Sequence, residues 1–207
     1  MPNWCYTTYH FHGKHNDLAI FRDKIIEWTS TGFTKTDFGD PWLGNILHGA
    51  GLQERIDNAD LDKRLSCRGT MMDISEVEKD NILEVYTETA WVPMGKMWQE
   101  VIKVLGLDIG FAFEAEEPGC NLFWIYDPKN YGDFDEDKIY LDVDLGDGVY
   151  FSEYTTEEGA LESLNKALQT NAPSLAAIDV ICEEYMSEHE DSFIRISEFE
   201  KITRLDD

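Results

Sequence analysis

The chain has 207 residues, of which 42 are acidic and 17 are basic, so its net charge is −25. A field of this sign repels phosphate backbones and argues against direct nucleic-acid binding. The apolar fraction of 43% is that of a globular protein, and no apolar run is long enough to span a bilayer.

The N-terminal segment predicts a strand followed by a helix. Side chains in residues 5–12 alternate between two faces, as in a strand that Gly13 ends. Asn16 is expected to cap a helix with apolar residues at helical spacing, and Gly32 is expected to close it. A short second strand is expected near residues 33–38.

The middle of the chain alternates between irregular and regular structure. Residues 39–63 are glycine-rich and predict a long excursion that contains a short helix. Two strands are expected at 65–74 and 82–89, joined by a charged turn. Pro93 is expected to open a helix, and Gly106 is expected to end it.

Two further strands, at 108–117 and 121–127, flank a Pro-Gly turn. The order of strands and helices through residue 127 is typical of an α+β fold, a ferredoxin-like sandwich with additional strands. We therefore predict a ferredoxin-like domain over residues 1–127.

Residues 128–207 predict an acidic C-terminal extension, packed in the same domain or beside it. It begins with an exposed linker and continues with a β-hairpin at 139–154. Capping residues at 155–158 and 173–174 predict two helices, and residues 192–202 predict a final strand.

The negative charge is concentrated in the second half of the chain. Residues 1–107 have a net charge of −5, whereas residues 108–207 have a net charge of −20. This asymmetry predicts that the acidic half meets a basic partner.

Four segments of the N-terminal part resemble a known family. They are MPNWC at the start, RGTMMD at 68–73, TETAWVP at 87–93 and EEPG at 116–119. Together they are similar to the YubB-type family of phage, plasmid and bacterial proteins. The resemblance implies a ferredoxin-like domain over residues 1–127 and a mobile-element setting, and it implies no established activity.

The chain departs from this family pattern at three positions. Arg68 stands where an aromatic residue is expected, Met72 stands in place of a tryptophan, and Met94 stands in place of a second proline. A shared aromatic pocket is therefore not expected to be preserved in full.

The spacing of the cysteines and the residues at the N-terminus indicate the cellular compartment of the protein. No basic start with a following apolar run is present, and the four cysteines show no CxxC spacing. We expect a cytoplasmic protein with free thiols, in which Cys67, Cys120 and Cys182 are buried.

His10 and His12 alternate on the first strand and face the same way. Two imidazoles at this spacing can share a divalent metal with a carboxylate from elsewhere, as in a small metal-dependent hydrolase or nuclease. The alternative is that both are ordinary polar residues on the half-exposed side of a sheet.

Acidic residues of the C-terminal half form the main candidate surface. If these carboxylates share one face, they can bind a basic protein. If that partner is a nucleic-acid-binding protein, the acidic face acts as a DNA mimic. The alternative is a solvated loop. The candidates are Asp133, Asp135, Glu136, Asp137, Asp142, Asp144, Asp147, Glu157 and Glu158.

A third hypothesis is a small-molecule pocket near Trp91 and Arg68. No catalytic motif is recognisable, and no cofactor is expected. The favoured function is a non-catalytic protein-binding module with an acidic surface, and the oligomeric state is left open.

Overall fold

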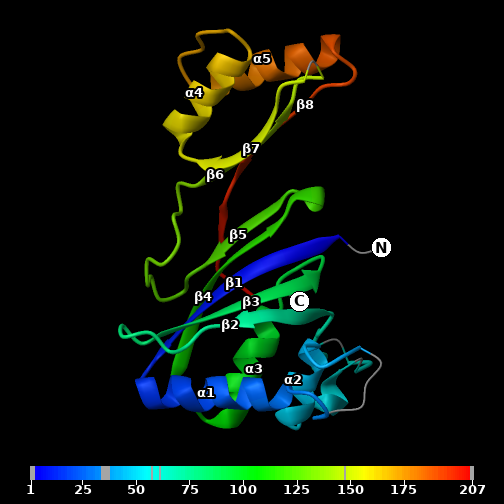
Figure 1. Cartoon of the computed structure of the whole chain (residues 1–207), viewed down its shortest axis with the longest axis vertical. Coiled ribbons are helices and arrows are strands. Elements are labelled where there is room, and N and C mark those ends of the chain that lie inside the picture. The colour runs from blue at the N-terminus through cyan, green and yellow to red at the C-terminus, as the bar shows by residue number, and fades with distance from the viewer. Residues whose placement is uncertain (1–2, 34–37, 57, 61, 147, 206–207) are drawn as a thin grey trace. The chain divides into compact units, whose positions relative to one another are not determined.

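The structure, a computed structural model, divides into two compact units (Figure 1). It describes residues 3–33, 38–56, 58–60, 62–146 and 148–205. Unit 1 comprises Met1–Phe134 and Lys201–Asp207, and unit 2 comprises Asp135–Glu200. Unit 2 is therefore an insertion in unit 1, and residues 128–134 and 201–207, which we assigned to the extension, lie in unit 1.

Unit 1 contains a six-stranded sheet with the order β2-β3-β1-β4-β5-β9. The pairs from β2 to β5 are all antiparallel. Helices α1, α2 and α3 lie on one face of this sheet (Figure 1). The bounds are β1 Trp4–Gly13, α1 His15–Trp28, α2 Leu43–Gly49, η1 Gln53–Arg55, β2 Gly69–Ile74, β3 Ile82–Ala90, α3 Gly95–Leu105, β4 Ile109–Glu117, η2 Pro118–Cys120, β5 Leu122–Tyr126 and β9 Glu200–Ile202.

Strand β1 supplies the centre of the core of unit 1. Its odd-numbered side chains, including Tyr9 and Phe11, are fully buried, whereas its even-numbered side chains lie on the opposite face. Trp98 of α3 packs edge-on against both aromatic rings, with centroids 5.8 Å and 5.5 Å away. Burying each such ring contributes about 1.5–3 kcal/mol, which fixes the alternation of β1.

The predicted helix after the first strand exists, but its start differs from the prediction. Lys14 and not Asn16 is the N-cap of α1, and no side chain caps this helix end. The end of α3 follows the prediction, because Gly106 adopts the left-handed conformation with φ of +66°.

The segment between α1 and β2 matches the prediction in part. The excursion contains the short helix α2, as expected, and the turn η1. Residues 34–37 of the predicted short strand lie outside the described part of the chain, and Phe33 and Phe38 are in no strand. The strand predicted at 65–74 begins only at Gly69.

Unit 2 pairs a three-stranded antiparallel sheet with two helices. The sheet has the order β7-β6-β8, and the predicted hairpin is present as β6 and β7. Thr156 and Ser174 cap the two helices through their hydroxyl groups, as predicted. The bounds are β6 Ile139–Asp144, β7 Tyr150–Thr155, α4 Glu157–Ala167, α5 Leu175–Glu188 and β8 Phe193–Glu198.

The core of unit 2 is separate from that of unit 1. Leu141 and Val143 of β6 are fully buried and belong to the same cluster as Leu164 of α4 and Ile178 of α5. The protein is thus of the α+β type, with two sheets that each have helices on one face. Within the described residues, no helix has the length and apolar character needed to cross a membrane.

Separate cores predict separate effects of core substitutions. Leu141→Ala removes a fully buried side chain of unit 2, and Leu83→Ala removes one of unit 1. Each substitution is expected to cost about 2–5 kcal/mol of local stability. Hydrogen exchange should lose protection mainly in the unit that carries the substitution, and an equal loss in both units from either variant would contradict two independent cores.

Candidate functional site

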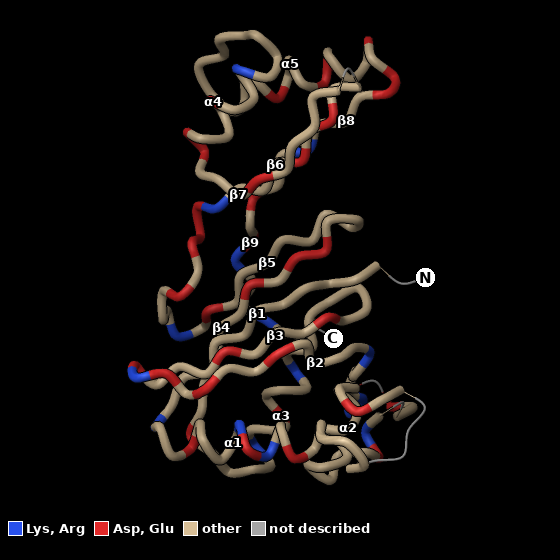
Figure 2. Tube along the Cα trace, viewed as in Figure 1, with Lys and Arg blue, Asp and Glu red and all other residues tan. Residues whose placement is uncertain are grey.

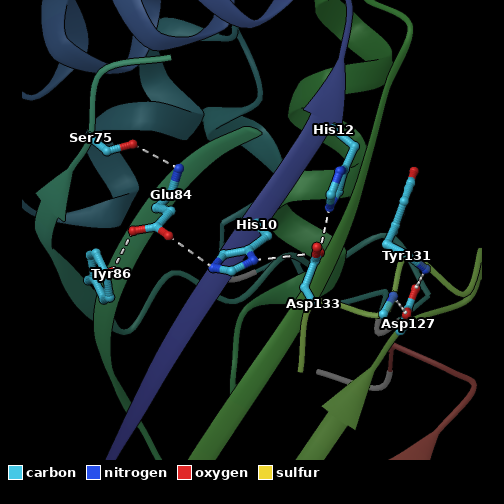
Figure 3. A network of polar contacts seen from close by, with 9 residues as sticks. His10, His12, Ser75, Glu84, Tyr86, Asp127, Tyr131 and Asp133 are labelled. Atoms are coloured by element: carbon cyan, nitrogen blue, oxygen red, sulfur yellow. Dashed lines mark hydrogen bonds and ion pairs between the residues drawn. The ribbon is translucent and has the colours of Figure 1, made fainter. Parts of the chain in front are cut away.

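His10 and His12 meet two carboxylates on the sheet face opposite the helices (Figure 3). His12 Nε2 is 2.5 Å from Asp133 Oδ2, a hydrogen-bond distance. His10 Nδ1 is 3.5 Å from the same oxygen, and His10 Nε2 is 3.3 Å from Glu84 Oε1. The Tyr86 hydroxyl donates to Glu84 Oε2 at 2.7 Å, so a continuous polar network crosses β1 and β3.

The network is largely shielded from solvent. The side chains of His10 and His12 are 15% and 16% exposed, and that of Asp133 is 10% exposed. The His12 ring and the Asp133 carboxylate share a hydrogen bond between Nε2 and Oδ2. A charge-assisted bond in a shielded place is stronger than the same contact in water.

Asp133 reaches the histidines because the loop at 127–134 folds onto the sheet. Asp127 at its start is buried and accepts hydrogen bonds from the backbone N–H groups of Tyr131 and Gly132, both at 2.9 Å. The Tyr131 ring stacks on His12 with centroids 3.7 Å apart. The Phe134 ring lies 4.6 Å from that of His10.

Gly110 of β4 leaves room for this loop. A Cβ atom at this position would lie 2.2 Å from the Tyr131 hydroxyl and 2.9 Å from Lys129 Nζ. A larger residue at 110 would therefore displace the stacked tyrosine. The histidines thus form, with Asp133, a clasp that holds the loop against β1.

The metal hypothesis required a third ligand near His10 and His12. The third group is present as Asp133, but both imidazoles face this carboxylate directly. Among the residues that the structure describes, no group of three or more His, Cys, Asp or Glu side chains is arranged to hold a metal ion. The arrangement is that of a hydrogen-bonded clasp.

The predicted acidic residues are distributed over both units. Asp133 belongs to unit 1 and is engaged in the clasp, whereas Asp135, Glu136 and Asp137 are exposed at the start of unit 2. Asp147 lies outside the described residues.

The other predicted acidic residues of unit 2 lie on different elements. Asp142 and Asp144 are partly exposed on β6, and Glu157 and Glu158 are exposed in the first turn of α4. At this turn the two carboxylates also stabilise the positive end of the helix dipole.

Helix α5 carries exposed carboxylates that the sequence-based selection omitted. Asp179, Glu183, Glu184 and Glu188 are all exposed, and the buried residues of this helix lie on its other side. The signal was available in the sequence, since these acids fall outside the apolar positions of the predicted helix.

Trp91 and Arg68, the candidate pocket residues, lie near each other at one end of the sheet. The backbone N–H of Ala90 donates to the Arg68 carbonyl at 2.8 Å. Trp91 is 43% exposed and has φ of +75°, with a hydrogen bond from the N–H of Val92 to the Ala90 carbonyl. This is the strained form of γ-turn, and it presents the indole outward.

The thiols follow the expectation except at one position. Cys5, Cys67 and Cys182 are buried, but Cys120 is exposed, so the prediction that it is buried is wrong. It lies in the turn η2, which the buried Glu117 carboxylate caps by accepting from the N–H of Gly119 at 3.0 Å. This turn places Cys120, its third residue, at the surface.

The chain was compared with protein-family models, curated proteins and solved structures, and none of them matches it.

The clasp predicts a stability effect of Asp133→Asn. The neutral amide weakens the hydrogen bond to His12, with an expected cost of about 1–3 kcal/mol. Denaturant unfolding and the exchange rates of the Tyr131 and Gly132 amide protons measure it. The matched control is Asp135→Asn, an exposed site, and equal effects of the two variants would contradict the clasp.

The difference in burial among the cysteines predicts that a thiol reagent labels them selectively. Burial raises the pKa of Cys5 and of Cys182 to about 11, so both are expected to be inert in the folded protein. Cys120 is expected to react first, and slowly at neutral pH, because the hydrogen bond to Glu117 raises the pKa of its thiol. Labelling of native protein should map to Cys120 by mass spectrometry and be absent in Cys120→Ser; label on Cys5 would contradict the burial.

Proposed function

We propose that this chain is a non-catalytic binding protein whose unit 2 binds a basic protein partner through exposed carboxylates. The observation that carries the proposal is the charge of unit 2, which has 18 acidic and 3 basic residues. No carboxylate side chain described in unit 2 is buried, so a partner can reach these charges. Figure 2 shows the acidic positions along the elements of this unit.

Helix α5 offers the most regular row of these charges. Asp179 and Glu183 are one helical turn apart, as are Glu184 and Glu188, which corresponds to a spacing of about 6 Å along the axis. The helix is packed through its buried side chains on the sheet of unit 2, so its outer carboxylates are held on a rigid element. A partner with basic side chains at comparable spacing would pair with several of them at once.

Electrostatics favours fast and salt-sensitive association. A strongly negative unit raises the local concentration of basic proteins and speeds their encounter. Exposed charge pairs are screened over about 8–10 Å at physiological salt, so the binding is expected to weaken steeply as salt rises.

A nucleic-acid-binding protein fits this chemistry best among basic partners. Its binding groove is already lined with lysine and arginine for phosphate groups, and the carboxylates of unit 2 would occupy the same places. With such a partner, unit 2 would act as a DNA mimic. This function agrees with the mobile-element setting that the YubB-type resemblance implies.

For unit 1, the same proposal includes a ferredoxin-like domain of the YubB type. Its support is the strand order β2-β3-β1-β4, with α1 between β1 and β2 and α3 between β3 and β4 in the chain. Two of the four segments that carry the resemblance, 68–73 and 116–119, correspond to β2 with the residue before it and to the end of β4 with the start of the following turn.

The test compares two triple variants of equal charge. The first neutralises α5 with Asp179→Asn, Glu183→Gln and Glu184→Gln. Affinity capture from host lysate in steps of rising salt first identifies a partner, whose affinity for both variants is then measured. We expect about a tenfold loss for the α5 variant, because each exposed pair contributes roughly 0.2–1 kcal/mol.

The matched control neutralises Glu54, Asp62 and Asp108, three exposed acids of unit 1, with the corresponding amides. It changes the net charge of the chain equally and leaves unit 2 intact. An equal loss in both triple variants, or binding that persists unchanged at high salt, would show that unit 2 is not the binding surface.

A further inference from the structure

The face of the six-stranded sheet that carries the clasp also exposes aromatic rings. Trp4 and Tyr6 of β1 are 43% and 50% exposed, and Tyr86 of β3 is 37% exposed. All three lie on the side of the sheet opposite the buried Cys5 and Thr7. Singly exposed apolar residues are common, but three rings on two adjacent strands are a feature that needs an explanation.

Each tyrosine in this group has a carboxylate beside it on the same face of the sheet. The strand register places Tyr6 directly opposite Glu88 and places Tyr86 diagonally across from Tyr6. The Tyr86 hydroxyl donates to Glu84 Oε2 at 2.7 Å, and Glu88 lies beside Tyr6 in the register. Rings and carboxylates therefore alternate across β1 and β3.

The ionisation of these groups follows from the same contacts. The negative charge of Glu88 and its hydrogen bond raise the pKa of Tyr6, and the hydrogen bond to Glu84 raises the pKa of Tyr86 to about 12. Both phenols thus stay neutral at physiological pH. Among the described residues, Glu88 has no lysine, arginine or histidine ion-pair partner.

We propose that Trp4, Tyr6 and Tyr86, with Glu84 and Glu88, form an arginine-binding patch on unit 1 for an arginine-bearing segment of the basic partner. A guanidinium group stacks flat on an aromatic ring and donates in its own plane to carboxylates beside the ring. The alternation of rings and carboxylates matches both requirements. The inference rests on the proposed function for the class of partner and adds a second surface and a side-chain preference.

Charge complementarity argues against nucleic acids and apolar peptides as ligands of this patch. Nucleic-acid bases also stack on tyrosine rings, but their phosphates would meet Glu84, Glu88 and a chain of net charge −25. A purely apolar segment would bury the Glu88 carboxylate without pairing it, which is costly. An ammonium group lacks the planar surface that stacks, so arginine is preferred over lysine.

The test uses two probes, a short labelled arginine-only peptide and a lysine-only peptide of equal length. Polarisation of the label gives their affinities for the full chain. We expect tighter binding of the arginine peptide to the wild type. In the double variant Tyr6→Ala and Tyr86→Ala this preference should fall by about five- to thirtyfold, because two cation–π contacts of roughly 0.5–1 kcal/mol each are lost.

Two controls make the outcome decisive. Tyr6→Phe with Tyr86→Phe keeps the rings and should keep the arginine preference, and its thermal unfolding shows whether loss of the hydroxyls disturbs the fold. The α5 triple variant should weaken both peptides equally and leave the preference intact. Equal affinity of the wild type for both peptides overturns the patch, as does a preference that disappears only in the α5 variant.

A labelled single-stranded oligonucleotide is the final probe. Binding of this probe that depends on Tyr6 and Tyr86 would make the patch a nucleic-acid surface and would overturn the arginine proposal. The proposed function of unit 2 fails on a different result, namely equal partner binding by the α5 variant and its unit 1 control.

Discussion

The fold of unit 1 depends on the pairing of strand β1 with two neighbouring strands. Because β3 and β4 pair with it on both sides, its backbone groups are used within the sheet, and its side chains must alternate between two different environments. One face delivers Tyr9 and Phe11 to the core, and the other delivers Tyr6, His10 and His12 to the polar face. A shift of the strand by one residue would exchange the two sets and remove the core and the clasp together.

The carboxylates of this protein fall into three physical classes, and the large net charge hides the difference. Glu117 and Asp127 are buried and hold turns by accepting backbone N–H groups. Asp133 is shielded and joins a loop to two histidines. Only the exposed acids, such as Asp179 and Glu183, form a field that a partner senses. Composition therefore overstates the charge available for binding.

Local signals predicted the structure where the relevant partner is near in sequence. The hydroxyl caps of α4 and α5, the hairpin of unit 2 and the end of α3 at Gly106 all involve residues within a few positions of each other. His12 and Asp133 are 121 positions apart, so no local pattern identifies them as partners. Cys120 is exposed, contrary to the prediction, because the cap at Glu117 folds residues 118–120 into a surface turn that the apolar neighbours of Cys120 in the sequence do not indicate.

The insertion of unit 2 has a consequence for how the protein can change over generations. Both chain connections to unit 2 start in unit 1, at the loop that ends with Phe134 and at Lys201. Within unit 1 the returning chain contacts the same loop, since Lys201 Nζ is 3.4 Å from Asn130 Oδ1. Because strands β2-β3-β1-β4-β5 all precede residue 135, the loss or insertion of unit 2 would interrupt none of their pairings.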